Sequence, residues 1–436
     1  MRNTRIVLVI VLCVFIGGCS GTPKPTADPT PAISVAGLLN ATAGTDATAI
    51  AEDFEPLPGA KAYVGMLEDA AYRIEIPANW NGGLLLWARG FRGYGPEVQA
   101  ELPPRALRQA VIADGFAWAS SSFSQNAYVA ALGANETLLL KRYFAERFEP
   151  PTLTIIAGES MGGHITVLSL ERFAGEYDGG LSLCGVVAGQ EWYDYLWGWP
   201  LAAEFISGAT LPLDDGKAAV AEALESQVLP ALGSPESPTL RGRAFASVIR
   251  ELTGGPRPFF EEGYREAYQF NFGLISGDPA REMEVSRAAS TLEFDYRADP
   301  GLGFDADEIN EGVRRLAPNA VLRDPATHPG TAPTTGDLQA PLLTLHETGD
   351  LTVPISMELS YREKVEAVGR GDLLVQRAIR GAGHCKFSDA ELVAAWDALV
   401  AWIGGGPKPR GDDLSGDLSE VGRAFTDPSR PGDRDP

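Results

Sequence analysis

The most constraining feature of this chain is an apolar run that leads straight into a glycine-flanked serine and then into a helical pattern. Thr152–Ala157 has the composition of a strand buried on both faces, and Met161–Phe173 has helical spacing. Between them lies GESMG (158–162), which fits G-x-S-x-G. A serine in so sharp a strand-to-helix turn is lifted clear of its sheet, and the helix N-terminus aims N–H groups at developing negative charge. Ser160 is therefore predicted to be a nucleophile.

Strand and helix patterns alternate on both sides of this motif. Further strands are expected at Ala62–Leu67, Tyr72–Ile76, Gly83–Ala88, Phe116–Ser121, Leu181–Val187, Pro341–His346 and Leu373–Ile379, and further helices at Pro104–Asp114, Glu136–Phe148, Pro354–Val368 and Asp389–Trp402. Strands separated by helices predict a mostly parallel sheet covered by helices on both faces, with the first two strands forming an antiparallel hairpin at one edge.

The alternation of strand and helix patterns is interrupted between the strands expected at 181–187 and 341–346. We expect a core of residues 51–189 and 337–406, interrupted by a largely helical cap at 190–336 with helices near 215–229 and 240–252. Residues 20–50 are rich in Thr, Pro, Ala and Gly and predict a flexible tether. Residues 407–436 are rich in Gly, Pro, Asp and Arg and predict a loose C-terminal tail.

A serine hydroxyl needs a neighbouring base, and the chain has four histidines. His384 is the predicted base, because it ends the glycine loop RGAGH (380–384) between the last strand and the last helix. The other three histidines are assigned no catalytic role. We expect His164 to pack beneath the serine turn and His346 to support the acid loop, and the sequence around His328 indicates no function.

The base in turn needs an acid that holds its tautomer. The segment HETGDLTVP (346–354) follows the penultimate strand and contains two acidic residues. Asp350 is the preferred acid because it lies on the far side of the loop, whereas Glu347 is only one residue past the expected strand. Glu347 stays open as the rival.

Two backbone N–H groups are expected to form an oxyanion hole. One belongs to Met161, directly after the serine, and the other to the loop RGFRGYG (89–95) after the strand at 83–88. Phe91 is the preferred donor, with Gly90 and Arg92 as open alternatives. The alternative is that the loop at 89–95 is only flexible and contributes no donor to an oxyanion hole.

The cysteines separate by position. Cys184 follows the serine helix and Cys385 follows His384, so both are expected near one edge of the sheet, either as a disulfide or as two buried thiols. Further along, Trp192, Tyr193 and Tyr195 predict either an aromatic wall of the substrate pocket or packing of the cap onto the sheet.

The first residues predict export. Met1–Arg5 carries two arginines and Ile6–Ile16 is an unbroken apolar run, too short to span a bilayer but suited to a signal peptide. It ends in IGGC (16–19), which resembles a bacterial lipobox and implies a signal over residues 1–19 with lipidation of Cys19. Plain secretion with cleavage nearby is the alternative. The expected location is the cell envelope or the exterior, with membrane contact only through the lipid.

Composition narrows the classes of partner. The formal net charge of −22 disfavours nucleic acid and anionic membrane surfaces. The chain shows no metal-ligand spacing and no dinucleotide-binding loop, so we expect no metal and no cofactor. The expected partner is a small-molecule ester.

The strings GESMGGH (158–164) and GAGHC (381–385) resemble secreted bacterial esterase-type members of the α/β-hydrolase superfamily, over roughly 60–190 and 340–405. The order Ser160, Asp350, His384 is that of this superfamily. The resemblance implies hydrolysis of a carboxylic ester through an acyl-enzyme. The alternatives are an amidase or peptidase with the same triad, or a non-catalytic surface-binding lipoprotein on a hydrolase scaffold. Arg89 departs from the common His-Gly form of the oxyanion loop.

Overall fold

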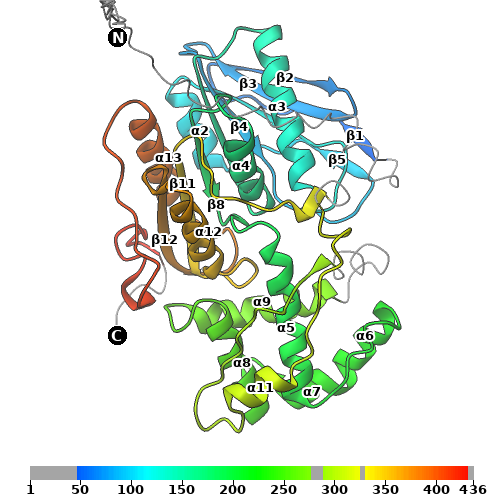
Figure 1. Cartoon of the computed structure of the whole chain (residues 1–436). Helices are drawn as coiled ribbons and strands as arrows, with labels where there is room; N and C mark the ends of the chain where they lie inside the picture. The colour runs from blue at the N-terminus through cyan, green and yellow to red at the C-terminus, as the bar shows by residue number, and fades with distance from the viewer. Residues whose placement is uncertain (1–46, 276–287, 325–328, 431–436) are drawn as a thin grey trace, which may run out of the picture. The chain divides into compact units, whose positions relative to one another are not determined.

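The computed structural model describes residues 47–275, 288–324 and 329–430 (Figure 1). The N-terminal signal, Cys19, His328 and most of the expected tether lie outside these residues. The elements before the inserted segment (residues 190–336) are β1 (Thr48–Ile50), β2 (Ala60–Leu67), β3 (Ala70–Pro77), β4 (Gly83–Ala88), β5 (Glu97–Gln99), α2 (Arg105–Ala113), β6 (Ala117–Ser121), α3 (Ala130–Arg147), β7 (Leu153–Glu159), α4 (Met161–Arg172) and β8 (Gly179–Leu183).

The described residues of the inserted segment are mainly helical up to Ile275 and mostly irregular from residue 288 onward. It contains α5 (Glu191–Ser207), α6 (Lys217–Ala223), the π-helix η1 (Leu224–Val228), α7 (Leu229–Leu232), the short strands β9 (Gly233–Ser234) and β10 (Ser237–Pro238), α8 (Leu240–Leu252), α9 (Phe260–Ile275), α11 (Ala306–Gly312) and the 3₁₀ turn η2 (Pro329–Thr331). Trp199 on α5 is fully buried, and its ring contacts Phe245, Tyr264 and Phe272. These aromatic contacts are part of the same apolar cluster that covers the α3 and α4 face of the sheet.

The chain then returns to the sheet with β11 (Leu342–Gly349), α12 (Ser356–Ala367), η3 (Gly371–Leu373), β12 (Leu374–Ala382), α13 (Asp389–Ile403) and η4 (Leu418–Glu420). α13 begins with a capping box in which Ser388 and Glu391 satisfy each other's backbone N–H groups. Among the described elements, no helix is long and apolar enough to cross a membrane.

The main sheet has eight strands in the order β2-β3-β6-β4-β7-β8-β11-β12. β3 runs antiparallel to β2 and β6, and all other neighbours are parallel. The chain has the α/β-hydrolase fold. After β4 the chain adds β6 on one side and β7 on the other, so the carboxyl ends of β4 and β7 meet at a switch point where ligands bind in such sheets.

Strand side chains alternate between the two faces and bury both. Leu84 and Leu86 face the cluster that includes α3 and α4, whereas Leu85 and Trp87 face the cluster that includes α2 and α13. This double burial explains why β4 is apolar at every position.

Two expectations about the chain ends are corrected. The end of the expected tether is ordered, because β1 pairs in parallel with β5. The expected loose tail packs along β12, the edge strand. Asp412 accepts the N–H of Ala378 at 2.8 Å, and Thr426 accepts the N–H of Arg380 at 2.7 Å. An edge strand leaves backbone groups unpaired, and the polar tail satisfies them.

Candidate active site

Ser160 lies in the turn between β7 and α4, with φ 54° and ψ −116°. A non-glycine residue rarely adopts such a backbone, so the turn is strained. A side chain on Gly162 would collide with the carbonyl oxygen of Ala88, and one on Gly158 would meet the same atom at 2.6 Å. The two glycines are therefore required for β7 to turn sharply against β4. The serine is left partly exposed at the switch point.

His384 and Asp350 come from the loops that follow β12 and β11. His384 Nδ1 lies 2.6 Å from Asp350 Oδ2, and the other carboxylate oxygen accepts the N–H groups of Thr352 and Val353 at 2.8 and 3.0 Å. Asp350 is fully buried, whereas 23% of the His384 side chain is exposed. A carboxylate held in this way fixes the tautomer of the imidazole, with the proton on Nδ1 and the lone pair on Nε2.

The rival acid has a different partner. Glu347 is fully buried and accepts the N–H of Lys386. Burial raises its pKa to about 8, and the charge of Asp350 adds to the rise. Glu347 is therefore uncharged near pH 7, which is the wrong state for stabilising an imidazolium.

The charge around His384 predicts the pH profile of the reaction. Burial alone lowers the pKa of His384, but the charge and hydrogen bond of Asp350 outweigh it, and the pKa rises above 6.5. Only the neutral imidazole accepts a proton, so activity falls as His384 becomes protonated. We expect the acidic limb of kcat/KM to lie above pH 6.5, measured on a soluble ester in constant-ionic-strength buffers. A limb near pH 5 would contradict this assignment.

The loop after β4 lies against the serine turn. A side chain on Gly90 would approach the carbonyl oxygen of Glu159 to 3.4 Å, and Arg92 pairs with the Glu159 carboxylate at 2.9 Å. Met161 is fully buried at the start of α4, and the ring of Phe91 is half-buried. The structure thus brings the two expected oxyanion residues to adjoining segments.

Arg89 explains how this loop departs from the common form. Its buried guanidinium donates to the carbonyl oxygens of Ser122, Gly90 and Gln125 at 2.9 to 3.2 Å and lies 4.9 Å from the ring centre of Phe123. Burial lowers the pKa of Arg89 to about 10, so the group stays charged at neutral pH. Sequence reasoning noticed Arg89 only as an exception, because its partners Ser122 and Gln125 are more than 30 residues away in the chain.

Cys184 and Cys385 form a disulfide across 201 residues, with Cα atoms 5.3 Å apart. Cys184 follows β8 and is held by a 2.7 Å hydrogen bond from its N–H to Leu345 O. The bridge therefore attaches the His384 loop to the centre of the sheet. Both sulfur atoms lie within 4.8 Å of a His384 nitrogen, but as a disulfide they offer no thiolate to a metal.

The aromatic residues of α5 pack onto the acid loop. Trp192 Nε1 donates to Thr352 O at 2.7 Å, and the Tyr195 hydroxyl donates to Leu351 O at 2.5 Å. Tyr193 is also buried. These contacts favour the packing interpretation, because the polar atoms of Trp192 and Tyr195 are bonded to the backbone beside Asp350.

Arg257 is a residue that sequence reasoning missed. It lies in the inserted segment, is almost completely buried, and donates to Thr348 O at 2.6 Å. Burial lowers its pKa to about 10, which leaves a cation close to Asp350. Nothing local marks it out, since the segment around it is an ordinary Gly/Pro loop.

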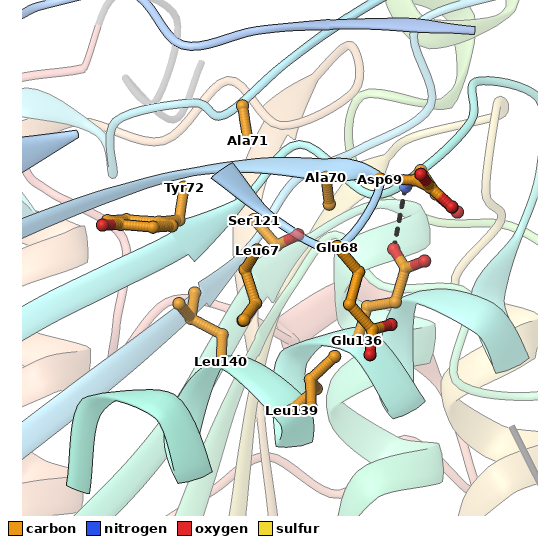
Figure 2. A pocket seen from close by; sticks show the side chains of 11 residues that line it. Leu67, Glu68, Asp69, Ala70, Ala71, Tyr72, Ser121, Glu136, Leu139 and Leu140 are labelled. Carbon is orange, nitrogen blue, oxygen red and sulfur yellow. Dashed lines mark hydrogen bonds between the residues drawn. The ribbon is translucent and has the colours of Figure 1, made fainter. Parts of the chain in front are cut away.

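A small cavity lies beneath the turn between β2 and β3 and is bounded by α3 (Figure 2). Glu136 borders it and accepts the N–H of Ser124 at 2.8 Å, and burial raises the Glu136 pKa to about 7. Its volume of about 20 Å³ is enough for one water molecule but not for an acyl group.

No family model matches the sequence. The chain is 24% identical to the o-phthalyl amidase of Xanthobacter agilis in an alignment of 417 residues, covering 81% of this chain and 90% of that protein. Among solved structures it is similar to feruloyl esterase B from Aspergillus oryzae, with a TM-score of 0.47, 12% identity and coverage of 80% and 81%. It is also similar to the acylaminoacyl peptidase of Pyrococcus horikoshii, with a TM-score of 0.40, 10% identity and coverage of 81% and 43%.

Proposed function

We propose that the protein is a serine hydrolase that cleaves a carboxylic ester through an acyl-enzyme on Ser160. The observation that carries this proposal is the 2.6 Å contact between His384 and Asp350 at the same sheet edge as the strained Ser160 turn. A buried acid, an oriented imidazole and a partly exposed serine form the arrangement that acyl transfer needs.

In the proposed reaction the Ser160 hydroxyl attacks the substrate carbonyl and His384 takes its proton. The developing oxyanion accepts N–H groups of Met161 and Phe91, and His384 then protonates the leaving alcohol. Water, deprotonated by the same imidazole, releases the acid and frees Ser160. Asp350 orients His384 and stabilises the imidazolium that forms in each step.

The second candidate is cleavage of an amide by the same residues. It is favoured by the sequence likeness to a protein named an o-phthalyl amidase. An amide has a poorer leaving group than an ester, so it depends more on proton delivery from His384. A panel of matched o-phthalyl and benzoyl esters and amides distinguishes the candidates by their kcat/KM ratios.

The decisive variant is Ser160→Ala. We expect it to lose covalent labelling by a fluorophosphonate probe and to lower kcat by about a millionfold, because no other group replaces the nucleophile. The matched control is Ser169→Ala, a buried serine on the same helix α4, which should label and turn over as the wild type does.

Two outcomes contradict the proposal. A Ser160→Ala variant with full activity would eliminate Ser160 as the nucleophile. A folded wild-type protein that neither labels nor turns over any ester or amide would instead favour a non-catalytic binding protein.

We also propose that the protein is exported and anchored through a lipid on Cys19. The disulfide supports export, since such bonds persist in oxidising compartments. The apolar run before Cys19 supports a signal peptide.

A further inference from the structure

A second histidine lies directly behind the proposed catalytic acid. His346 is on β11, and its side chain is 1% exposed. Its Nε2 lies 2.7 Å from the carbonyl oxygen of Val353 and 3.8 Å from Asp350 Oδ2. Because a carbonyl oxygen only accepts, Nε2 carries a proton and directs it at the acid loop.

The other side of this imidazole faces a buried carboxylate. His346 Nδ1 lies 3.4 Å from Oε1 of Glu358 on α12. The second oxygen of Glu358 accepts hydrogen bonds from Thr344 Oγ1 and Gln376 Nε2, each at 2.7 Å. A neutral imidazole with a proton on Nε2 would turn a lone pair toward that carboxylate. A second proton on Nδ1 removes this repulsion and pairs the two charges.

We propose that His346 is a buried imidazolium, held by Glu358, that acts as a positioning residue by orienting and balancing the Asp350 carboxylate behind His384. This inference rests on the proposed function for its effect on turnover. It extends the proposed triad by a second acid–histidine pair, so that Glu358, His346, Asp350 and His384 form a continuous series in which carboxyl groups alternate with imidazoles.

The surrounding charges agree with a cation at this position. Burial lowers the pKa of His346, but the close contact with Glu358, its charge and the charge of Asp350 outweigh it and raise the pKa to about 9. Glu347, the neighbour on β11, has its pKa raised to about 8 by burial and is uncharged near pH 7.

Two further groups face Asp350 from the inserted segment. Arg257 is a buried cation near the acid loop. Burial raises the pKa of Tyr195, so its phenol stays neutral. Asp350 thus interacts with two cationic groups, the His346 imidazolium proposed here and the Arg257 guanidinium.

This arrangement has a kinetic consequence. The positive charge of His346 opposes protonation of His384 and lowers the His384 pKa, against the rise caused by Asp350. Removing the His346 cation therefore raises the pKa of His384. Asp350 also loses a neighbouring charge that helps to hold it in place. The His384 imidazole is then oriented less firmly, and kcat falls.

The first test is the charge of His346 itself. In ¹⁵N-histidine-labelled wild-type protein at pH 8, we expect one buried histidine with both ring nitrogens protonated, whose signals vanish in His346→Gln. In Glu358→Gln that histidine should become a neutral tautomer. If His346→Gln does not fold, the signals are assigned by removing the other three histidines in turn. A singly protonated His346 at pH 8 would overturn the proposal.

The second test is the pH profile of His346→Gln. The glutamine amide keeps a donor for the Val353 carbonyl but carries no charge. We expect the acidic limb of kcat/KM to move upward by about half a pH unit, with kcat lower by about tenfold. Glu358→Gln should move the limb in the same direction. An unmoved limb in a folded His346→Gln protein would contradict the proposal, since a merely structural role changes only stability.

His164→Gln is the matched control. His164 is equally buried and bonded to Tyr128 Oη and Ala332 O, but burial lowers its pKa to about 3, so its removal deletes no charge. Its acidic limb should not move, and a shift equal to that of His346→Gln would count against the proposal. If the wild type has no hydrolase activity, the proposed function fails, while the NMR spectrum still decides the charge of His346.

Discussion

Replacing Asp350 by asparagine is expected to lower kcat by about ten-thousandfold while leaving the fold intact. Asparagine is nearly the same size and accepts the N–H groups of Thr352 and Val353 through its oxygen. Its amide nitrogen, however, donates toward His384 Nδ1 and so favours the wrong tautomer. Nε2 then carries the proton that it should accept from Ser160. Steady-state kinetics at pH 7 with a saturating ester measure the loss.

Glu347→Gln is the matched comparison, because it makes the same change in the rival acid three residues earlier. Glu347 is already uncharged near pH 7, and it bonds the backbone of the His384 loop rather than the imidazole. We expect kcat to stay within about threefold of wild type, since the neutral isostere preserves the charge state. A large loss in Glu347→Gln together with a small loss in Asp350→Asn would exchange the two assignments.

The second large effect concerns the disulfide. Replacing Cys184 and Cys385 together by alanine is expected to lower the free energy of unfolding by about 3–5 kcal/mol, because the bridge closes a long loop in the unfolded chain. The His384 loop also loses its attachment to β8, so kcat should fall even in the remaining folded molecules. Urea denaturation followed by tryptophan fluorescence measures the loss of stability.

Reduction provides the control for the cysteine prediction. Wild-type protein in a strong thiol reductant should lose a comparable stability, whereas the double variant should be insensitive to the reductant. Equal stability of the oxidised wild type and the double variant would show that the bridge contributes nothing. Labelling of two thiols in unreduced, denatured wild type would show that it is not formed.

Much of the fold was predictable because its determinants are local. The apolar runs of β4 and β7 and the glycines around Ser160 depend on short-range sterics and on burial of both strand faces. The expected hairpin and the alternation of strands and helices appear in the structure for the same reason. Patterns that one turn or one strand can impose are visible in the sequence alone.

The structure of the inserted segment was harder to predict from the sequence. Helix α5 contains Pro200 in its interior and is buried on most of its sides, so it lacks the two-faced spacing that marks a surface helix. Its aromatic residues were noticed, but their contacts with the acid loop are made to residues more than 150 positions away. The C-terminal tail was predicted to be loose but packs against β12. Its residues pair with backbone groups at the edge of the sheet, and no pattern in the tail itself predicts this.

The sequence by itself determined the types of the candidate residues and their order along the chain: a serine, an acid and a histidine, each on a loop after a strand. Only the tertiary structure decided which acidic side chain faces the His384 ring, how Arg89 holds the loop after β4, and that His346 lies between Glu358 and Asp350. The physical reason is range. A strained turn is set by neighbouring residues, whereas the pairing of buried charges depends on which strands and helices meet across the sheet.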